Sequence, residues 1–156
     1  MKPKILFILH LPPPIHGAAM MGKYIQESEL VNSSFDCFCI NLATAGSLSD
    51  IGHISLKKLL KYFFLLKHIS HVVREIRPEL VYITPNAGGK AFFKDFIVVQ
   101  MLKSMGCKVI AHYHNKGVSV YQSKWVYNFF YKRFFSNLKV ILLAENLYKD
   151  IAKYVK

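Results

Sequence analysis

Two closely spaced histidines give this chain its densest group of side chains that could do chemistry. Residues 112–116 (His-Tyr-His-Asn-Lys) follow an apolar run and combine two imidazoles with an amide and an amine. Imidazoles exchange protons near neutral pH and bind hydroxyl groups, so the segment predicts sugar binding or proton transfer. In an extended strand His112 and His114 share one face, with Tyr113 on the other. A metal site is a second interpretation, although the sequence supplies no clear third ligand.

A glycine pair stands in a second segment of this kind, residues 84–90 (Thr-Pro-Asn-Ala-Gly-Gly-Lys), which also follows an apolar run. Gly88 and Gly89 permit close approach of the backbone to a ligand. The side chains of Asn86 and Lys90 could bind hydroxyls or phosphate. A helix-opening loop with solvated polar side chains is the competing interpretation.

A proline-stiffened loop forms the third segment, residues 10–19 (His-Leu-Pro-Pro-Pro-Ile-His-Gly-Ala-Ala). It brings Gly17 to the start of a predicted helix, where free amides and the helix dipole favour a phosphate. The segment lacks the Gly-x-Gly-x-x-Gly pattern, so an ordinary dinucleotide site is not expected. A rigid structural turn would explain the same residues.

Apolar runs and helical patterns alternate along the chain and position these three segments. Strands are predicted at residues 5–9, 35–40, 80–84, 108–113 and 139–143. Helices are predicted from Gly17, at about 55–76, from the glycine pair to Gly106, at 123–135 and at 145–155, with a Ser/Gly-rich loop at 43–52. The alternation predicts one α/β domain, a Rossmann-like doubly wound parallel sheet. Ligands bind such sheets beyond the carboxyl ends of the strands, where the three segments lie.

The order and spacing of four segments resemble the N-terminal domain of group 1 (family 4) GT-B glycosyltransferases. The segments are residues 5–22, 77–83 (Arg-Pro-Glu-Leu-Val-Tyr-Ile), 108–114 (Lys-Val-Ile-Ala-His-Tyr-His) and 140–145 (Val-Ile-Leu-Leu-Ala-Glu). The resemblance implies that residues 1–156 form one half of a GT-B fold, the acceptor side, without the C-terminal donor domain. Members of this family transfer a sugar from a nucleotide donor, usually with retention of configuration and without an essential metal.

The resemblance also implies roles for single residues. His114 corresponds to the histidine that ends the fourth strand and faces the reacting sugar. Gly17, followed by Ala18, corresponds to the glycine-rich loop at the donor phosphate. The acceptor is then expected at His16, Asn86, Lys90, His112, Asn115 and Glu145. The chain departs from the family by having His16 in place of a second glycine and Ala144 in place of a serine.

The implied activity is that of a hexosyltransferase that extends a glycan or polyprenyl-linked acceptor in polysaccharide biosynthesis. The nucleotide-sugar is a substrate, and no cofactor is expected. Charge stabilisation of the departing diphosphate belongs to the family's second domain, so the isolated chain is predicted to be inactive. The alternative is a non-catalytic, membrane-associated module that recruits a separate catalytic chain. A nucleotide-binding oxidoreductase is disfavoured, because Asn41 stands where a ribose-binding acid would follow the second strand.

Positive charge dominates the composition, with 21 Lys and Arg against nine Asp and Glu and a formal net charge of +12. Such an excess predicts a polyanionic partner: a nucleic acid, an anionic membrane or phosphorylated substrates. No nucleic-acid recognition motif accompanies the charge, so nucleic acid is not an expected partner.

The helix at 55–76 is predicted to have a core stripe and an opposite basic face. The predicted core residues are Leu59, Tyr62, Leu66, Ile69, Val73 and Ile76, and the basic face holds Lys57, Lys61, His68 and His71 with Phe64. This face indicates either a helix drawn to anionic lipid or an ordinary solvated surface. Residues 121–135 mix aromatic and cationic side chains too widely for one core face. They are predicted to dock lipid, a lipid-linked acceptor or the second domain.

The three cysteines do not suit a disulfide framework. Cys37 and Cys39 are predicted to be small buried side chains of one strand face in a reducing compartment. The N-terminal apolar run is short and lacks a cleavage site, and no stretch approaches the roughly 20 apolar residues of a spanning helix. The expected location is cytoplasmic, with peripheral association at the inner face of the cell membrane as an open alternative.

Overall fold

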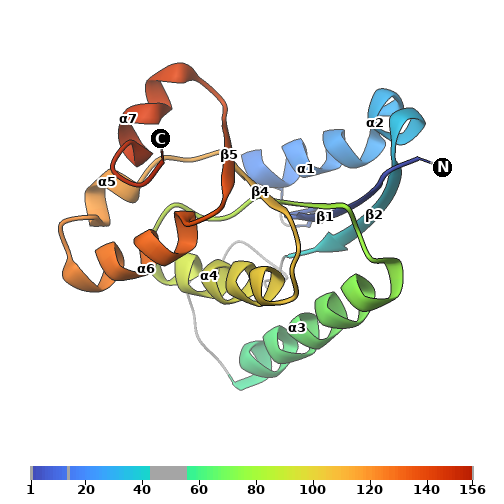
Figure 1. The fold of residues 1–156 in the computed structure, drawn as a ribbon, viewed down its shortest axis with the longest axis horizontal. Helices are drawn as coiled ribbons and strands as arrows, with labels where there is room; N and C mark the ends of the chain where they lie inside the picture. The colour runs from blue at the N-terminus through green and yellow to red at the C-terminus, as the bar shows by residue number, and fades with distance from the viewer. Residues whose placement is uncertain (1, 14, 43–55, 156) are drawn as a thin grey trace. The chain divides into compact units, whose positions relative to one another are not determined.

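Five strands form a parallel sheet flanked by helices in the computed structural model, which describes residues 2–13, 15–42 and 56–155 (Figure 1). The strand order is β2-β1-β3-β4-β5. The strands are β1 (Lys4–Leu9), β2 (Asp36–Asn41), β3 (Leu80–Ile83), β4 (Val109–Tyr113) and β5 (Lys139–Leu142). All five predicted strands are therefore present, and the predicted α/β class with a parallel sheet is confirmed. The sheet is compatible with a Rossmann-like fold. The predicted loop at 43–52 lies outside the described residues.

Each predicted helix is present near its expected position except at the C-terminal end. They are α1 (Gly17–Glu27), α2 (Glu29–Ser34), α3 (Leu56–Ile76), α4 (Gly89–Ser104), α5 (Val118–Tyr121), α6 (Trp125–Phe135), the 3-10 helix η2 (Glu145–Leu147) and α7 (Tyr148–Ile151). The short helices α2 and α5 were not predicted. The prediction of one helix over 145–155 was wrong. The amide of Tyr154 donates to the Ile151 carbonyl at 2.8 Å, three residues back, and this turn ends α7. No helix in the described ranges is long and apolar enough to cross a bilayer.

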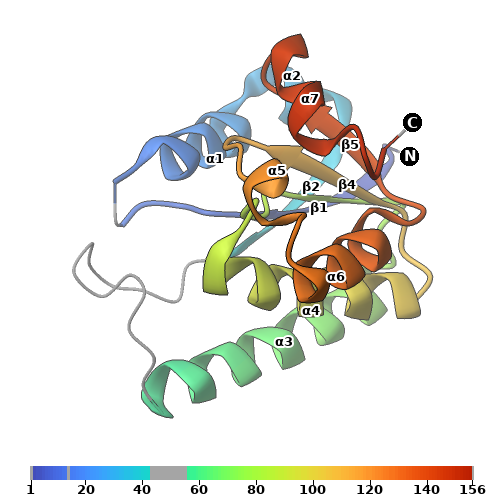
Figure 2. The ribbon, with the colours of Figure 1, turned by 90° about the vertical axis from the view of Figure 1, so that its left-hand side faces the viewer.

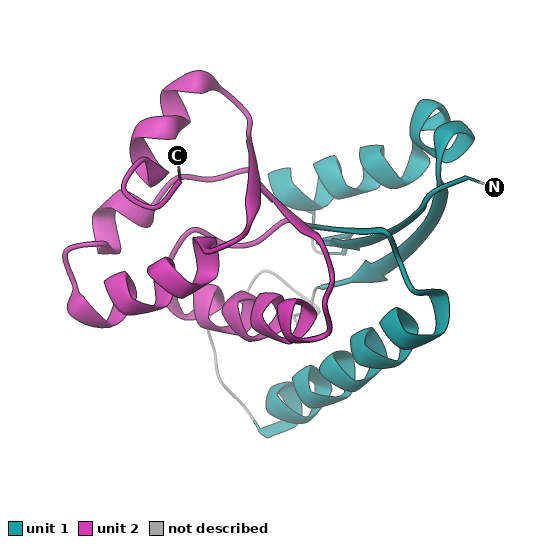
Figure 3. Cartoon of the chain, in the orientation of Figure 1, with its two compact units in different colours: residues 1–82 teal, residues 83–156 magenta. Residues whose placement is uncertain are grey.

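Two compact units make up the chain, residues 1–82 and residues 83–156 (Figure 3). In the first unit β1 and β2 pair in parallel, from Lys4 opposite Asp36 to Leu9 opposite Asn41. Helices α1 and α2 lie on one side of this strand pair and α3 on the other (Figures 1 and 2). Residues 5–9 of β1 are all buried, as expected for a strand covered on both faces.

Helix α3 buries a narrower stripe than its sequence predicts. Tyr62, Ile69 and Val73 are buried, whereas Leu59, a predicted core residue, is 60% exposed. Burial begins at Tyr62, so the first turn of the helix extends beyond the core of the first unit. The predicted basic face, with Phe64 among its cations, is exposed as expected.

The prediction that Cys37 and Cys39 are buried was wrong. Cys37 is half-buried and Cys39 is exposed. Both lie on β2, which is at the edge of the sheet and pairs on one side only, with β1, among the described strands. Cys37, Cys39 and Cys107 are free thiols.

An aromatic core between α4 and α6 accounts for most of the aromatic residues of the second unit. The ring of Phe92 on α4 lies 4.6 Å from that of Tyr131 and 5.5 Å from that of Phe134, both on α6. Of the aromatic side chains on α6, only Trp125 and Phe129 are exposed. The wide aromatic distribution therefore reflects packing against α4 more than it reflects an open docking surface.

Candidate functional site

The histidine pair lies at the carboxyl end of β4, in the second unit. Val109, Ala111 and Tyr113 are buried, so the intervening positions of the strand point to its other face. The rings of His112 and His114 contact each other there, with centroids 4.2 Å apart. Their predicted common face is confirmed. Tyr113 is buried against α6, where its ring stacks on Phe135 at 5.9 Å.

Both histidines of this pair are neutral at physiological pH. Burial, and to a smaller extent the neighbouring His114, lower the pKa of His112 from 6.5 to about 4. Burial also lowers the pKa of His114. A neutral imidazole carries one hydrogen-bond donor and one acceptor, which matches the two hydrogen-bonding modes of a hydroxyl group. The pair is therefore suited to hold a hydroxyl-rich molecule, and unsuited to act as a protonated acid.

Several buried polar atoms near this strand end have no hydrogen-bond partner among the described residues. They are Nδ1 and Nε2 of His114 and Oγ1 of Thr84; Oη of Tyr113 is also unpaired but belongs to the opposite face of β4. Thr84 follows the last residue of β3, the strand next to β4. Buried polar atoms are nearly always paired with protein or water, so a group of unpaired ones indicates a place for water or a ligand. His114 contributes two such atoms.

A buried carboxylate fixes the loop between β3 and α4. Asp95 on α4 is 2% exposed, and its Oδ2 accepts hydrogen bonds from the backbone amide and the side-chain nitrogen of Asn86. Burial raises the pKa of Asp95 to about 6, against the opposing effect of these two bonds. Sequence reasoning missed Asp95. The available signal was a single acidic residue within an otherwise apolar and basic helix.

The same loop is held from two further elements. Oδ1 of Asn115 accepts a hydrogen bond from the Ala87 amide at 3.2 Å. The hydroxyl of Tyr131 on α6 donates to the Ala87 carbonyl at 2.6 Å. Asn86 and Asn115, both predicted to contact an acceptor, thus have contacts that order the loop beside the histidine pair. Their role in acceptor binding stays a prediction.

Glycine is favoured at positions 88 and 89 of this loop for two different structural reasons. A side chain at Gly88 would collide with the ring of Tyr121, which lies directly against the glycine backbone. Gly89 has a φ of +67°, in the left-handed region that favours glycine. The space beside Gly88 is therefore taken by Tyr121, and the predicted close approach of a ligand there is not available. Lys90 is exposed on the first turn of α4.

The predicted phosphate segment belongs to the first unit. His16 is the N-cap of α1, and its Nδ1 accepts a hydrogen bond from the Ala19 amide at 3.3 Å. Gly17 begins the helix as expected, and a Cβ built there meets nothing within 4 Å. At Gly22 a Cβ would collide with the His10 carbonyl, so this glycine lets α1 pack closely beside the end of β1. The need for glycine at position 22 was not predicted.

The predicted residues divide between the two units. His16, Gly17 and Ala18 lie in the first, and Asn86, Lys90, His112, His114, Asn115 and Glu145 in the second. The β3–α4 loop and the end of β4 bring Asn86 and Asn115 into one hydrogen-bonded arrangement next to the histidines. Glu145 is exposed at the start of η2, after β5. Asn41, at the end of β2, accepts a hydrogen bond from the Leu11 amide.

No group of three or more His, Cys, Asp or Glu side chains is arranged to hold a metal ion within residues 2–13, 15–42 and 56–155. Within those ranges, the two histidines at the end of β4 have no third ligand of the kind that a protein metal site needs.

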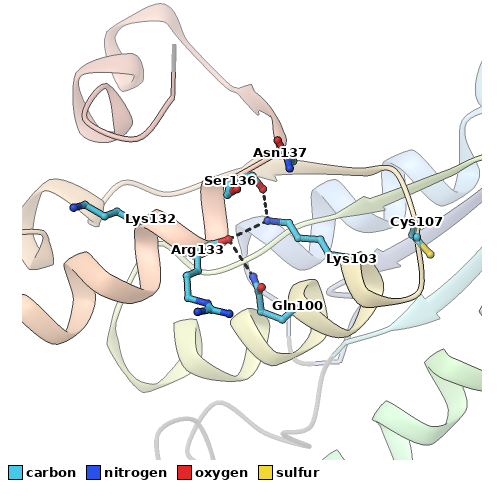
Figure 4. Close-up of a pocket in the computed structure, with 8 residues that line it drawn as sticks. Gln100, Lys103, Cys107, Lys132, Arg133, Ser136 and Asn137 are labelled. Carbon is cyan, nitrogen blue, oxygen red and sulfur yellow. Dashed lines mark hydrogen bonds between the residues drawn. The ribbon is translucent and has the colours of Figure 1, made fainter.

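A hollow of about 530 Å³ lies elsewhere in the second unit, at the C-terminal ends of α4 and α6 (Figure 4). None of the predicted site residues lines it. The ammonium group of Lys103 donates to the carbonyls of Arg133, Phe134 and Ser136 at the end of α6. Burial lowers the pKa of Lys103 to about 8. Lys103 thus caps the last turn of α6, which explains why a cation is partly buried there.

Comparison with protein-family models, with curated proteins and with solved structures gave no match to this chain. Any assignment of function therefore rests on the fold and on the geometry of the strand ends. They describe a parallel α/β protein with a neutral, partly buried histidine pair beside a loop held by Asp95.

Proposed function

We propose that this chain is the N-terminal, acceptor-side domain of a GT-B glycosyltransferase, with a doubly wound sheet. Its reaction moves a sugar from a nucleotide-sugar to a glycan or lipid-linked acceptor with retention of configuration. The observation that supports this proposal best is the His112–His114 pair, with both ring nitrogens of His114 buried and unpaired. The ordered similarity of the four sequence segments to that family is the second support.

The protonation state of the pair narrows its role. His112, with a pKa near 4, is a weak base and carries no extra proton to donate as an acid at neutral pH, and burial lowers the pKa of His114 in the same direction. His114 would instead hydrogen-bond the hydroxyl groups of the transferred sugar as a neutral imidazole. His112, in ring contact with it, would complete the polar surface towards the acceptor. Because hydroxyl contacts that strengthen in the transition state accelerate glycosyl transfer, the position of His114 matters more than its basicity.

The start of α1 would bind the donor phosphate. Helix α1 has eleven residues, and the first amides of such a helix attract an anion. His16 engages the Ala19 amide, which leaves Gly17 and Ala18 as the residues proposed to approach the phosphate. The open space at Gly17 is compatible with a phosphate close to the backbone. Lys90, on the first turn of α4, is proposed to contact the acceptor together with Glu145.

The direct test is replacement of His114 by Ala in the natural full-length polypeptide, assayed with nucleotide-sugar donors and glycan or polyprenyl-linked acceptors. We expect turnover to fall about 100-fold or more, the range for loss of a group at the reacting centre. The melting temperature should change little, because the ring nitrogens make no hydrogen bond within the protein. His68→Ala, on the exposed face of α3, is the matched control. Unchanged turnover in His114→Ala would remove this residue from the mechanism.

A binding measurement separates this function from the non-catalytic alternative. Imidazole ¹⁵N resonances of the chain would be recorded during titration with nucleotide-sugars and oligosaccharides. We expect the His112 and His114 signals to shift, and the shifts to disappear when Asp95→Ala releases the β3–α4 loop. Sugar ligands that shift neither histidine would favour a module that recruits a separate catalytic chain.

A further inference from the structure

The first half of α3 exposes an unusual amount of apolar surface. Five large apolar side chains within nine residues are between 50% and 74% exposed: Leu56, Leu59, Leu60, Phe63 and Phe64. Single exposed apolar residues are common on protein surfaces, but contiguous groups of this size mark interaction sites. These five residues are called the α3 ridge below.

Helical geometry places the ridge on one continuous face. At 3.6 residues per turn its five side chains fall within an arc of about 140° and extend over about 12 Å along the helix. The buried residues Tyr62, Ile69 and Val73 occupy a separate arc that faces the core of the first unit. The helix thus has two apolar faces, and the folding of the described part of the unit covers only one of them.

The surroundings of the ridge are strongly cationic. Lys57, Lys61 and Lys67 lie among or beside the ridge residues, and no acidic residue occurs in the sequence from Leu56 to Arg74. The ammonium group of Lys67 lies over the ring of Phe63, 4.8 Å from its centroid. Long lysine side chains can extend their charge to a polar layer while their methylene groups remain on apolar surface.

We propose that the α3 ridge docks this protein on an anionic lipid bilayer. The helix would lie flat in the membrane interface, with its leucines and phenylalanines at the acyl boundary and its lysines at the lipid phosphates. This proposal does not rest on the proposed glycosyl transfer.

The combination of apolar and cationic side chains favours a lipid bilayer as the binding partner over other polyanions and over a second copy of the chain. A nucleic acid would neutralise the lysines but would leave three leucine and two phenylalanine side chains in water. A symmetric dimer through the ridge would bring the Lys57 and Lys61 side chains of two copies together, and like charges repel. An anionic bilayer satisfies the apolar and the cationic groups together, with a phosphate layer above an apolar layer.

The first experiment measures sedimentation of the chain with vesicles of phosphatidylcholine alone and of phosphatidylcholine mixed with phosphatidylglycerol. We expect binding to the anionic vesicles, weakened by added salt, and weak binding to the neutral ones. The double variant Leu59→Ser with Phe63→Ser should bind the anionic vesicles at least about tenfold more weakly than the parent chain. Leu30→Ser with Val120→Ser changes two similarly exposed apolar residues outside the ridge and should bind as the parent chain does.

The charge component has its own matched pair of variants. Lys57→Gln with Lys61→Gln should weaken binding to anionic vesicles about tenfold or more, because each removes a cation from the membrane surface. Lys139→Gln with Lys149→Gln lowers the net charge equally at exposed positions elsewhere. Equal losses in both variants would show a non-specific charge effect and overturn the assignment to α3.

A fluorescence measurement locates the contact directly. Trp125 is the sole tryptophan of the chain, so Trp125→Phe combined with Phe63→Trp moves the fluorophore onto the ridge. Anionic vesicles should shift its emission to the blue, and brominated lipids should quench it. Vesicle binding without quenching would place the contact on another surface and overturn the proposal. Absence of vesicle binding, or self-association that the ridge variants abolish, would overturn it as well.

Discussion

The carboxylate of Asp95 accepts two hydrogen bonds from Asn86, one from its backbone amide and one from its side-chain nitrogen, both 2.8 Å long. A single buried oxygen therefore fixes both the path of the β3–α4 loop and the orientation of an amide beside the histidine pair.

Replacement of Asp95 by Asn should change how the free energy of unfolding depends on pH. The pKa of Asp95 is raised from 3.8 to about 6, so the folded chain holds this proton more tightly than the unfolded chain. Stability from this group is complete below about pH 4 and falls by about 3 kcal/mol as the pH rises through 6. Asp95→Asn should abolish that fall, which chemical denaturation at a series of pH values would reveal.

Over the same pH range, His112 has the opposite effect to Asp95 on the pH dependence of the free energy of unfolding. Its pKa is lowered from 6.5 to about 4, so the folded chain binds this proton less tightly, and stability rises with pH across that interval. In the parent chain the two effects partly cancel. Asp95→Asn should therefore show a net rise in stability between about pH 4 and 6.5, and His112→Asn should show a net fall. A parallel pH dependence in both variants would contradict the two assignments.

A second carboxylate joins the C-terminal segment to the loop after β4, and its removal should be costly. Asp150 accepts hydrogen bonds from the amides of Gly117, Val118 and Ser119 and from the Ser119 hydroxyl. Burial alone would raise its pKa, but these bonds outweigh burial and lower it. Asp150→Ala should reduce the free energy of unfolding by about 1–3 kcal/mol in urea titrations near neutral pH.

The pH dependence distinguishes this contact from simple packing. Because the pKa of Asp150 is lowered, its contribution is present above the ordinary carboxyl pKa and is lost as the pH falls below it. The difference between the parent chain and Asp150→Ala should shrink in acid. Ser119→Ala removes the hydroxyl donor but keeps three amide bonds, so it should cost less.

The aromatic core predicts a clear contrast between two large side chains of the second unit. Phe92 is fully buried and contacts rings on α4 and α6, so Phe92→Ala should cost about 3–5 kcal/mol. Trp125 is 80% exposed, so Trp125→Ala should change stability by less than about 0.5 kcal/mol. Denaturant midpoints of the two variants provide the comparison. A large loss in Trp125→Ala would mean that this side chain is packed.

Two glycines of α1 should respond oppositely to the same substitution. Gly22→Ala places a methyl group against the His10 carbonyl and should destabilise the chain by about 1–3 kcal/mol. Gly17→Ala meets open space and should leave stability unchanged or slightly improved. Thermal unfolding measures both. If Gly17 approaches a donor phosphate as proposed, Gly17→Ala should still raise the KM for the nucleotide-sugar in the full-length protein.

Strand positions and the order of elements could be predicted from sequence because local patterns determine them. The continuous apolar run of β1 and the alternation along β4 place strands and identify their faces, including the common face of His112 and His114. Element ends depend on hydrogen bonds that no local pattern contains. The short helix α5 begins where the amides of Gly117, Val118 and Ser119 donate to Asp150, more than thirty positions further along the chain.

The candidate site was predictable in its residue types and less so in their partners. Histidines and asparagines after strand ends are visible in the sequence, but the carboxylate that binds Asn86 lies nine residues away on a helix. Asp95 resembles an ordinary helical residue until its burial is known. The exposure of Leu59 could not be predicted from the sequence either. Helical periodicity gives its position around the helix but does not say how far along the helix the core extends.

The contact between Gly88 and Tyr121 has a consequence for the evolution of this chain. Because the aromatic ring occupies the volume that any β-carbon at position 88 would need, the two positions cannot vary independently. Homologues that keep an aromatic residue at 121 should retain glycine at 88, and those with a larger residue at 88 should carry a small one at 121. An alignment of such sequences would then show the pair as a covarying signal, although the residues are 33 positions apart.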